Sequence, residues 1–135
     1  YHATMPTDAL RHFRDALIEA EGFGLEALKQ AQIRLGEEVR GLMERYSYKS
    51  VAADGFKAPS VVVCFAPSAE MKSGKAFAEQ GLQIAAGVPL ECGEREDYAS
   101  FRIGLFGLDK LMDIDRTVAN LETALEKIRG QNAPA

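Results

Sequence analysis

The sequence predicts an α+β fold in which a small, mainly antiparallel sheet is packed on one face by helices. Three observations predict it. Two long segments at the start and one at the end repeat apolar residues every three or four positions, as amphipathic helices do. The middle of the chain instead holds short β-branched or alternating segments between glycines and prolines, which are typical of strands. The apolar faces of the helices need a surface to cover, and the sheet supplies it.

Composition narrows the class of protein. The chain has 135 residues, 47% of them hydrophobic and 27% charged, with a net charge of −4. This length and apolar content suit one domain with its own core and exclude a mainly disordered chain. The negative charge argues against nucleic-acid binding, and the longest apolar run, residues 61–66, is too short to span a membrane. Because two cysteines do not make a disulfide framework, we expect a reducing cytoplasm.

The first part of the chain predicts two helices. Thr7 follows a proline and is the expected N-cap of a helix over residues 8–21. The apolar face of this helix is formed by Leu10, Phe13, Leu17 and Ala20. Gly22 and Gly24 interrupt the pattern, and a second helix is predicted over residues 25–46. Its apolar stripe consists of Leu28, Ala31, Leu35, Val39 and Leu42.

The middle of the chain predicts the strands. Val51 begins a short extended segment that ends at the turn signal Asp54–Gly55. Three further segments are β-branched or alternate between apolar and other residues, and these predicted strands are 61–66, 82–86 and 100–106. A short helix over residues 70–80 separates the first two of them. A loop over residues 88–99 separates the last two.

The end of the chain predicts one more helix. Asp113 is its expected N-cap, because an aspartate there can accept a backbone N–H of the first turn. The apolar stripe of this helix consists of Val118, Leu121, Leu125 and Ile128. Residues 130–135 are expected to fray.

Most of the other candidate motifs have structural interpretations. His2 and His12 have no second ligand three or four residues away, so the sequence predicts no metal site. The segment around Lys75 lacks the spacing of a phosphate-binding loop. Cys64 falls in the first predicted strand, as a small core residue. Cys92 falls in the loop over residues 88–99, but no histidine lies near it in sequence to activate its thiol.

Arg102 is the most informative polar residue. It alternates with Phe101 and Ile103 in the last predicted strand, so its side chain is expected on the face opposite to theirs. Nearby glycines leave room for a small anion, and an arginine holds a carboxylate through two parallel hydrogen bonds. Two structural alternatives remain open from the residues alone. Arg102 could lie on an edge strand and reach water, or form a salt bridge to Glu94 or Asp97.

Several segments resemble a known enzyme family. They are the opening Tyr1–Thr4, the strand motif Phe101–Gly107, and the pairs Asp115-Arg116, Leu121-Glu122 and Ala124-Leu125. Together they resemble the C-terminal portion of class V pyridoxal-phosphate aminotransferases, and within them the alanine–glyoxylate and serine–pyruvate aminotransferases. The resemblance runs from Tyr1 to about Ile128. The opening and the strand motif are its specific parts, while the helices between them resemble the family mainly in layout.

The resemblance implies a division of the chain. In that family a large N-terminal domain precedes a smaller α+β domain, so residues 1–9 would continue from a missing large domain. Residues 10–130 would form the small domain, and residues 131–135 a frayed tail. The first residue is tyrosine rather than methionine, which also leads us to expect a longer parent protein.

The resemblance also implies roles for three residues. Arg102 matches the arginine that binds the substrate carboxylate. Tyr1 and Thr4 match the tyrosine and threonine whose hydroxyls bind the phosphate of pyridoxal 5′-phosphate in the neighbouring subunit of a dimer. The implied substrates are a small amino acid, such as alanine or serine, and a 2-oxo acid, such as glyoxylate or pyruvate.

The chain lacks part of what the resemblance requires. None of its lysines matches the family's Schiff-base lysine, which belongs upstream of Tyr1 together with the carboxylate that pairs with the pyridine nitrogen. We therefore expect the chain by itself neither to bind the cofactor tightly nor to transaminate. Two other hypotheses remain: a desulfurase-like enzyme of the same class that uses Cys92, although the context Leu90–Gly93 does not match, and a stand-alone interaction or small-molecule-sensing module with a structural Arg102.

Overall fold

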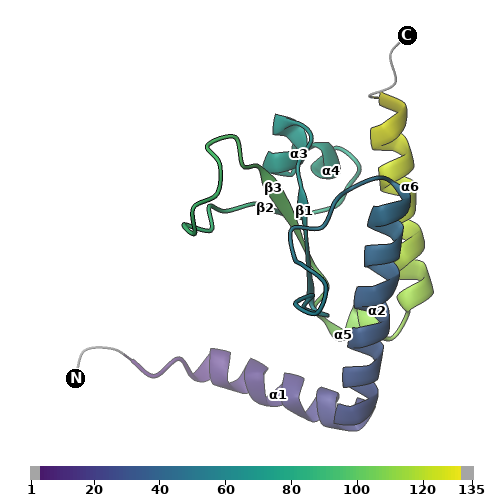
Figure 1. Ribbon diagram of the computed structural model, residues 1–135. Helices are drawn as coiled ribbons and strands as arrows, with labels where there is room; N and C mark the ends of the chain where they lie inside the picture. The colour runs from purple at the N-terminus through teal and green to yellow at the C-terminus, as the bar shows by residue number, and fades with distance from the viewer. Residues whose placement is uncertain (1–3, 132–135) are drawn as a thin grey trace.

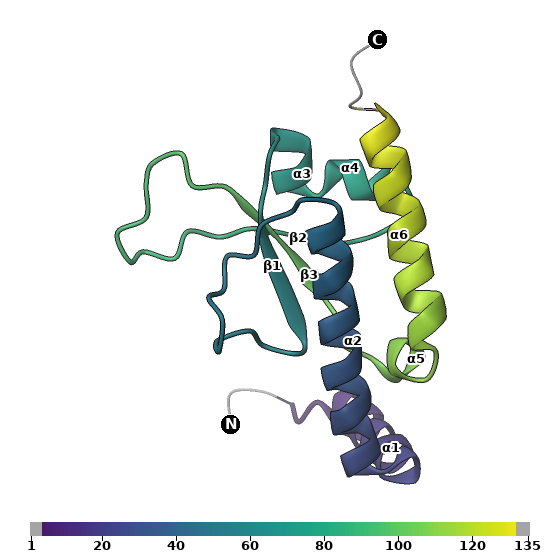
Figure 2. The same cartoon turned by 45° about the vertical axis from the view of Figure 1, so that its right-hand side comes forward.

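The computed structural model of the protein describes residues 4–131. The helices are α1 (Thr7–Phe23), α2 (Leu25–Arg45), α3 (Ala69–Ser73), α4 (Lys75–Ala78), α5 (Leu108–Leu111) and α6 (Ile114–Gln131). The strands are β1 (Val61–Phe65), β2 (Ala85–Ala86) and β3 (Ser100–Gly104). Figures 1 and 2 show α2 and α6 running beside each other along one side of the strands, with α3 and α4 near one end. The predicted α+β fold is confirmed.

The three strands form one antiparallel sheet in the order β1-β3-β2. β3 is therefore the central strand, and its Arg102 pairs with Val63 on β1 and with Ala85 on β2. Phe101 and Ile103 are buried toward the helices, while Arg102 between them is half-buried on the other face. This alternation is the one that the sequence predicts.

One hydrophobic core lies between the sheet and the helices. It contains most of the predicted stripes of α2 and α6 together with inward-facing strand residues, whereas Ala31 and Val118 are partly buried against it and Leu28 lies outside it. Its fully buried large side chains are Phe77, Phe101, Leu35, Leu42, Met43, Met71, Leu125, Ile128, Val39, Val62 and Cys64. Phe101 is central to this core, because its ring contacts Tyr48 edge-on at 5.7 Å and Phe77 at 5.4 Å between centroids.

The extended segment predicted at Val51 pairs with β1 without becoming a full strand. Ser50 forms an isolated antiparallel bridge with Cys64. The N–H of Val51 donates to the carbonyl of Val63 at 3.0 Å. The chain then turns at the predicted position, where Gly55 has a φ of 84°. Ser50 and Val51 thus cover part of the outer edge of β1 through backbone hydrogen bonds.

Several helix boundaries differ from the predictions for local reasons. Thr7 is the first helical residue rather than the N-cap, and no side chain caps α1 at its N-terminus. α1 continues through Gly22 and ends at Phe23, because the following Gly24 has a φ of 97°, outside the helical region. Gly74, with a φ of 81°, divides the predicted helix 70–80 into α3 and α4.

The later elements also differ in length. β2 has two residues instead of the predicted segment 82–86, because Leu82 and Ile84 pack against the core from outside the sheet. The short helix α5 was not predicted and follows Gly107, whose φ is 106°. α6 continues to Gln131, beyond the point at which fraying was predicted.

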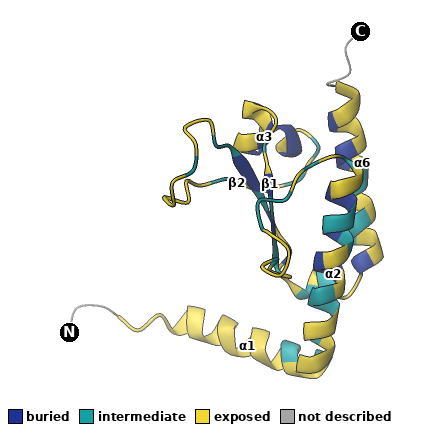
Figure 3. Cartoon of the chain, viewed as in Figure 1, coloured by how far each residue is buried: buried dark blue, intermediate teal, exposed yellow. Residues whose placement is uncertain are grey.

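α1 departs most from the prediction that the helices pack on the sheet. None of its residues is buried, and Leu10, Phe13 and Leu17 on its apolar face remain 50%, 63% and 48% exposed. Figure 3 shows α1 extending away from the body of the molecule beyond the start of α2. The segment is an amphipathic helix as predicted, but its apolar face does not pack on the sheet.

We expect the 135-residue chain to self-associate through the apolar face of α1, because contiguous exposed apolar surface favours association. Phe13→Asp should restore a monomer without loss of helical circular dichroism. His12→Asp is the matched control, since His12 lies on the opposite, polar side of the helix and is exposed. Sedimentation velocity measures the result. A wild-type chain that is monomeric at high concentration would contradict the prediction.

Candidate functional site

Arg102 lies at the middle of the central strand, on the sheet face opposite the helices. Its Nε donates a hydrogen bond to the backbone carbonyl of Ala86 at 3.0 Å. Within residues 4–131, its two Nη nitrogens make no hydrogen bond or ion pair with the protein. Its strand neighbours Val63 and Ala85 are small and apolar, so a planar cation is presented by a rigid sheet among side chains that do not compete for it.

The structure removes both structural alternatives for Arg102 that the sequence left open. Arg102 is not on an edge strand, because β3 lies between β1 and β2. Its predicted salt-bridge partners are engaged elsewhere: Asp97 accepts from Arg95 at 2.9 Å, and Glu94 accepts backbone N–H groups of its own loop. The guanidinium therefore retains donors for an anion outside the described chain.

Of the two predicted cofactor residues, the structure describes Thr4, which lies before α1 and outside the sheet that carries Arg102. Thr4 is exposed, and its hydroxyl makes no hydrogen bond within the part of the chain that the structure describes. It precedes α1, whose starting end lies away from α2 and the sheet (Figure 1). Tyr1 lies outside the described residues. The structure thus does not bring Thr4 and Arg102 into one site of a single chain.

The two cysteines differ sharply in environment. Cys64 is 1% exposed, and burial raises the pKa of its thiol to about 11, so it is an inert core residue as predicted. Cys92 is exposed in the loop between β2 and β3. His12, the one histidine among the described residues, is exposed on α1 and distant in sequence. No cluster of residues within 4–131 could hold a metal ion, and no helix in this range has the length and apolar character to cross a membrane.

The loop between β2 and β3 is organised by Glu94. Its Oε1 accepts the N–H of Leu90 at 2.5 Å and of Glu91 at 2.9 Å, and its Oε2 accepts the N–H of Cys92 at 2.9 Å. Led by the bond from Cys92, these hydrogen bonds lower the pKa of the Glu94 carboxyl to about 2. Ionised Glu94 therefore joins three consecutive backbone N–H groups of the loop.

We expect this loop to lose order in acid at an unusually low pH. Since the folded pKa is depressed, the carboxylate stabilises the loop fully above its ordinary pKa near 4.5, and the contribution is lost as pH falls toward about 2. Glu94→Gln should remove this stabilisation of the loop at every pH, so amide hydrogen exchange at residues 90–92 should become faster. Glu96→Gln in the same loop is the control. Equal exchange in wild type and Glu94→Gln would contradict the prediction.

A cavity of about 380 Å³ opens on the helical side of the sheet, and Arg102 does not line it. Ile84, Ile103 and Leu121 contribute to its apolar wall, and Lys110 and Arg116 contribute positive charge to its rim. Both cations are paired: Nζ of Lys110 lies 3.3 Å from an Asp109 oxygen, and Nε of Arg116 lies 3.3 Å from an Asp113 oxygen. The rim therefore offers no unpaired charge to a ligand.

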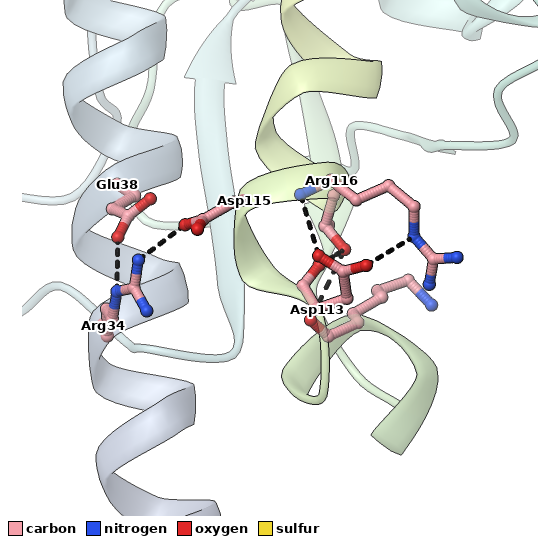
Figure 4. Close-up of polar contacts among 7 residues, drawn as sticks. Arg34, Glu38, Asp113, Asp115 and Arg116 are labelled. Atoms are coloured by element: carbon pink, nitrogen blue, oxygen red, sulfur yellow. Dashed lines mark hydrogen bonds and ion pairs between the residues drawn. The ribbon is translucent and has the colours of Figure 1, made fainter.

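Figure 4 shows polar contacts near the start of α6. Arg34 on α2 donates to Glu38 on the same helix and to Asp115 on α6, both at 2.6 Å. Asp113 accepts the N–H of Arg116 at 3.1 Å, which confirms Asp113 as the helix N-cap. These side chains join and cap helices, and exposed ion pairs of this kind each contribute little to stability.

Solved structures of aminotransferases resemble this chain, among them the following two. The crystal structure of alanine–glyoxylate aminotransferase from Nostoc sp. matches 95% of it with a TM-score of 0.74 and 21% sequence identity. This chain has the fold of an aminotransferase small domain. An aspartate aminotransferase of subgroup IV from Thermus thermophilus matches 72% of it with a TM-score of 0.50 and 20% identity.

The match covers a part of each solved chain. This protein spans 33% of the Nostoc chain and 26% of the Thermus chain. No protein-family model matches the sequence, and no curated protein sequence matches it. The structural likeness therefore establishes the fold, and the activity has to be argued from the residues.

Proposed function

We propose that this chain is the C-terminal domain of a class V aminotransferase that depends on pyridoxal 5′-phosphate. The parent would transfer an amino group between a small amino acid, such as alanine or serine, and a 2-oxo acid, such as glyoxylate or pyruvate. One observation carries the proposal: Arg102 presents unpaired donors on the sheet face opposite the helices. The aminotransferase fold supports it, as does the resemblance of the strand motif that contains this arginine.

Arg102 would bind the carboxylate that every substrate and product of the reaction shares. A guanidinium has five N–H donors, and Arg102 spends its Nε–H on Ala86. The four N–H bonds on its two Nη atoms remain, and two of them can donate in parallel to both oxygens of a carboxylate. Because the side chain projects from a central strand, it would also fix the orientation of the bonds at the substrate Cα.

The described residues fit a supporting role toward the cofactor. The Thr4 hydroxyl has no partner within residues 4–131 and is suited to donate to a phosphate oxygen. Its separation from Arg102 agrees with a phosphate site in a partner subunit, to which Tyr1 would also contribute. When bound, pyridoxal 5′-phosphate supplies an electron sink for bonds at the substrate Cα. The lysine that would hold it belongs to the remainder of the parent.

The exposed apolar face of α1 also fits a larger protein. Leu10, Phe13 and Leu17 would be covered by the large domain or by the second subunit of a homodimer, and α1 would connect the two domains. The two free cysteines agree with a reducing cytoplasm as the location.

The full-length parent tests the proposed function directly. Purified protein should carry the visible absorbance of bound pyridoxal 5′-phosphate, and alanine or serine should bleach or shift it within one turnover. Glyoxylate or pyruvate should then restore it with release of the new amino acid. A parent without this absorbance, or one that alanine and serine leave unchanged, would favour the interaction or sensing module instead.

Thr4→Ala in the parent is expected to weaken retention of pyridoxal 5′-phosphate. A hydrogen bond to a charged group contributes about 1.5–3 kcal/mol, so the dissociation constant should rise by about one to two orders of magnitude. Tyr1→Phe should have a similar effect, whereas Thr4→Ser keeps the hydroxyl and serves as the control. Equilibrium dialysis of the cofactor measures the change. Unchanged affinity in both Thr4→Ala and Tyr1→Phe would remove these residues from the phosphate site.

A further inference from the structure

The orientation of Arg102 depends on a single backbone group. The carbonyl of Ala86 accepts its Nε–H at 3.0 Å, and this is the contact that the structure gives the guanidinium within residues 4–131. Nε carries one hydrogen, so this bond uses the side edge of the guanidinium and leaves the end edge, formed by the two Nη atoms, for a carboxylate. Whatever fixes the Ala86 carbonyl therefore fixes the plane in which Arg102 meets a carboxylate.

β2 by itself holds that carbonyl weakly. The strand consists of Ala85 and Ala86 alone, which pair with Arg102 and Phe101. The pairing is extended by one residue, because the N–H of Gly87 donates to the carbonyl of Ser100 at 2.9 Å. This bond lies directly after Ala86, at the end of the strand where the chain departs into the loop.

Gly87 permits this approach because it has no side chain. A Cβ at this position would lie 2.1 Å from both the carbonyl oxygen and Oγ of Ser100, far inside van der Waals contact. The φ of Gly87 is not in the left-handed region, so the glycine serves close packing of two backbones rather than an unusual dihedral angle. Since one contact atom belongs to the backbone of β3, a side-chain rotation could not relieve the clash.

We propose that Gly87 is a positioning residue for Arg102. By letting the backbone approach Ser100, Gly87 holds the Ala86 carbonyl against Nε of Arg102 and so sets the plane of the two Nη atoms. The inference rests on the proposed function, because it assumes that Arg102 binds the substrate carboxylate. It goes further in assigning the geometry of that binding to a glycine that itself touches no substrate.

Gly87→Ala in the full-length parent tests the proposal, with Gly22→Ala as the matched control because a Cβ at Gly22 meets no atom within 4 Å. The readout is kcat/KM for alanine divided by kcat/KM for ethylamine, the same amine without its carboxylate. Gly87→Ala should lower this ratio about 10- to 100-fold through misplacement of Arg102. Gly22→Ala should leave it unchanged, and cofactor absorbance should persist in both variants.

Arg102→Ala separates the two levels of the proposal. If Arg102→Ala lowers the ratio and Gly87→Ala does not, the positioning role of Gly87 is wrong while the proposed function stands. If Arg102→Ala leaves the ratio unchanged, the proposed function itself fails. When Arg102 is already alanine, adding Gly87→Ala should not change the ratio further. A general structural defect would instead lower kcat/KM for both alanine and ethylamine, whether or not Arg102 is present.

A second measurement does not depend on the folding of Gly87→Ala. A crystal structure of the wild-type parent with pyruvate should retain the bond between Nε of Arg102 and the Ala86 carbonyl, with the pyruvate carboxylate on the Nη atoms. A carboxylate bound to Nε, with the Ala86 carbonyl displaced, would overturn the proposal.

Discussion

Arg102→Ala in the full-length protein is expected to lower kcat/KM for alanine or serine by about a hundredfold or more. Two charge-assisted hydrogen bonds contribute about 1.5–3 kcal/mol each, and non-additivity and a replacing water reduce their sum of about 3–6 kcal/mol. The effect should appear in the rate as well as in substrate affinity, because the same contact orients the bonds at Cα. Cofactor absorbance should persist, since the phosphate is bound elsewhere in the proposed site.

Arg102→Lys tests whether binding needs two parallel hydrogen bonds from a guanidinium or only a positive charge. A lysine keeps the positive charge but cannot form two parallel hydrogen bonds in one plane, so it should recover part of the lost activity. A purely structural Arg102 predicts a different outcome, namely a lower melting temperature with kcat/KM of the folded enzyme near the wild-type value. Both quantities are therefore measured on one preparation, and the second pattern would refute the carboxylate role.

The fold was predictable where the residues that follow an apolar repeat in the sequence are also the residues that are buried. Leu35, Val39 and Leu42 repeat at helical spacing and are all fully buried, and Phe101 alternates with Arg102 as the sheet requires. α1 differs, because Leu10 and Phe13 follow the same pattern and remain exposed. Periodicity identifies an apolar face but does not say which surface covers it.

Of the proposed site, the sequence singles out Arg102 but not the contacts around it. Arg102 stands out in sequence because a cation interrupts an apolar strand. The bond from Arg102 to the Ala86 carbonyl, the close approach of Gly87 to Ser100 and the hydrogen bonds of Glu94 within its own loop depend on which backbone segments lie side by side in space. Glu94 does stand out in the sequence, but as a possible salt-bridge partner of Arg102 and not as an acceptor of loop N–H groups.

Phe101→Ala is expected to lower the free energy of unfolding of the 135-residue chain by about 3–5 kcal/mol, the usual range for truncating a buried phenylalanine. Phe101 is 0% exposed, and its ring lies against Tyr48 and Phe77, so its removal leaves a cavity that the rigid sheet cannot close. Small domains have about 5–15 kcal/mol in total, so this one substitution would consume much of the stability.

Neighbouring Arg102 provides the matched control for Phe101, because the two side chains lie on opposite faces of the same strand. Arg102→Ala removes one partly exposed hydrogen bond to Ala86 and should cost about 1 kcal/mol. Phe101→Leu fills part of the space and should cost less than Phe101→Ala. Urea unfolding at low protein concentration measures the stability of all three variants. A shift in the urea midpoint, with an unchanged dependence of the unfolding free energy on urea concentration, gives the change in stability. If Phe101→Ala and Arg102→Ala shifted the midpoint equally, the core would not be packed against this face of β3, and the division of the strand into a core face and a more exposed face would be wrong.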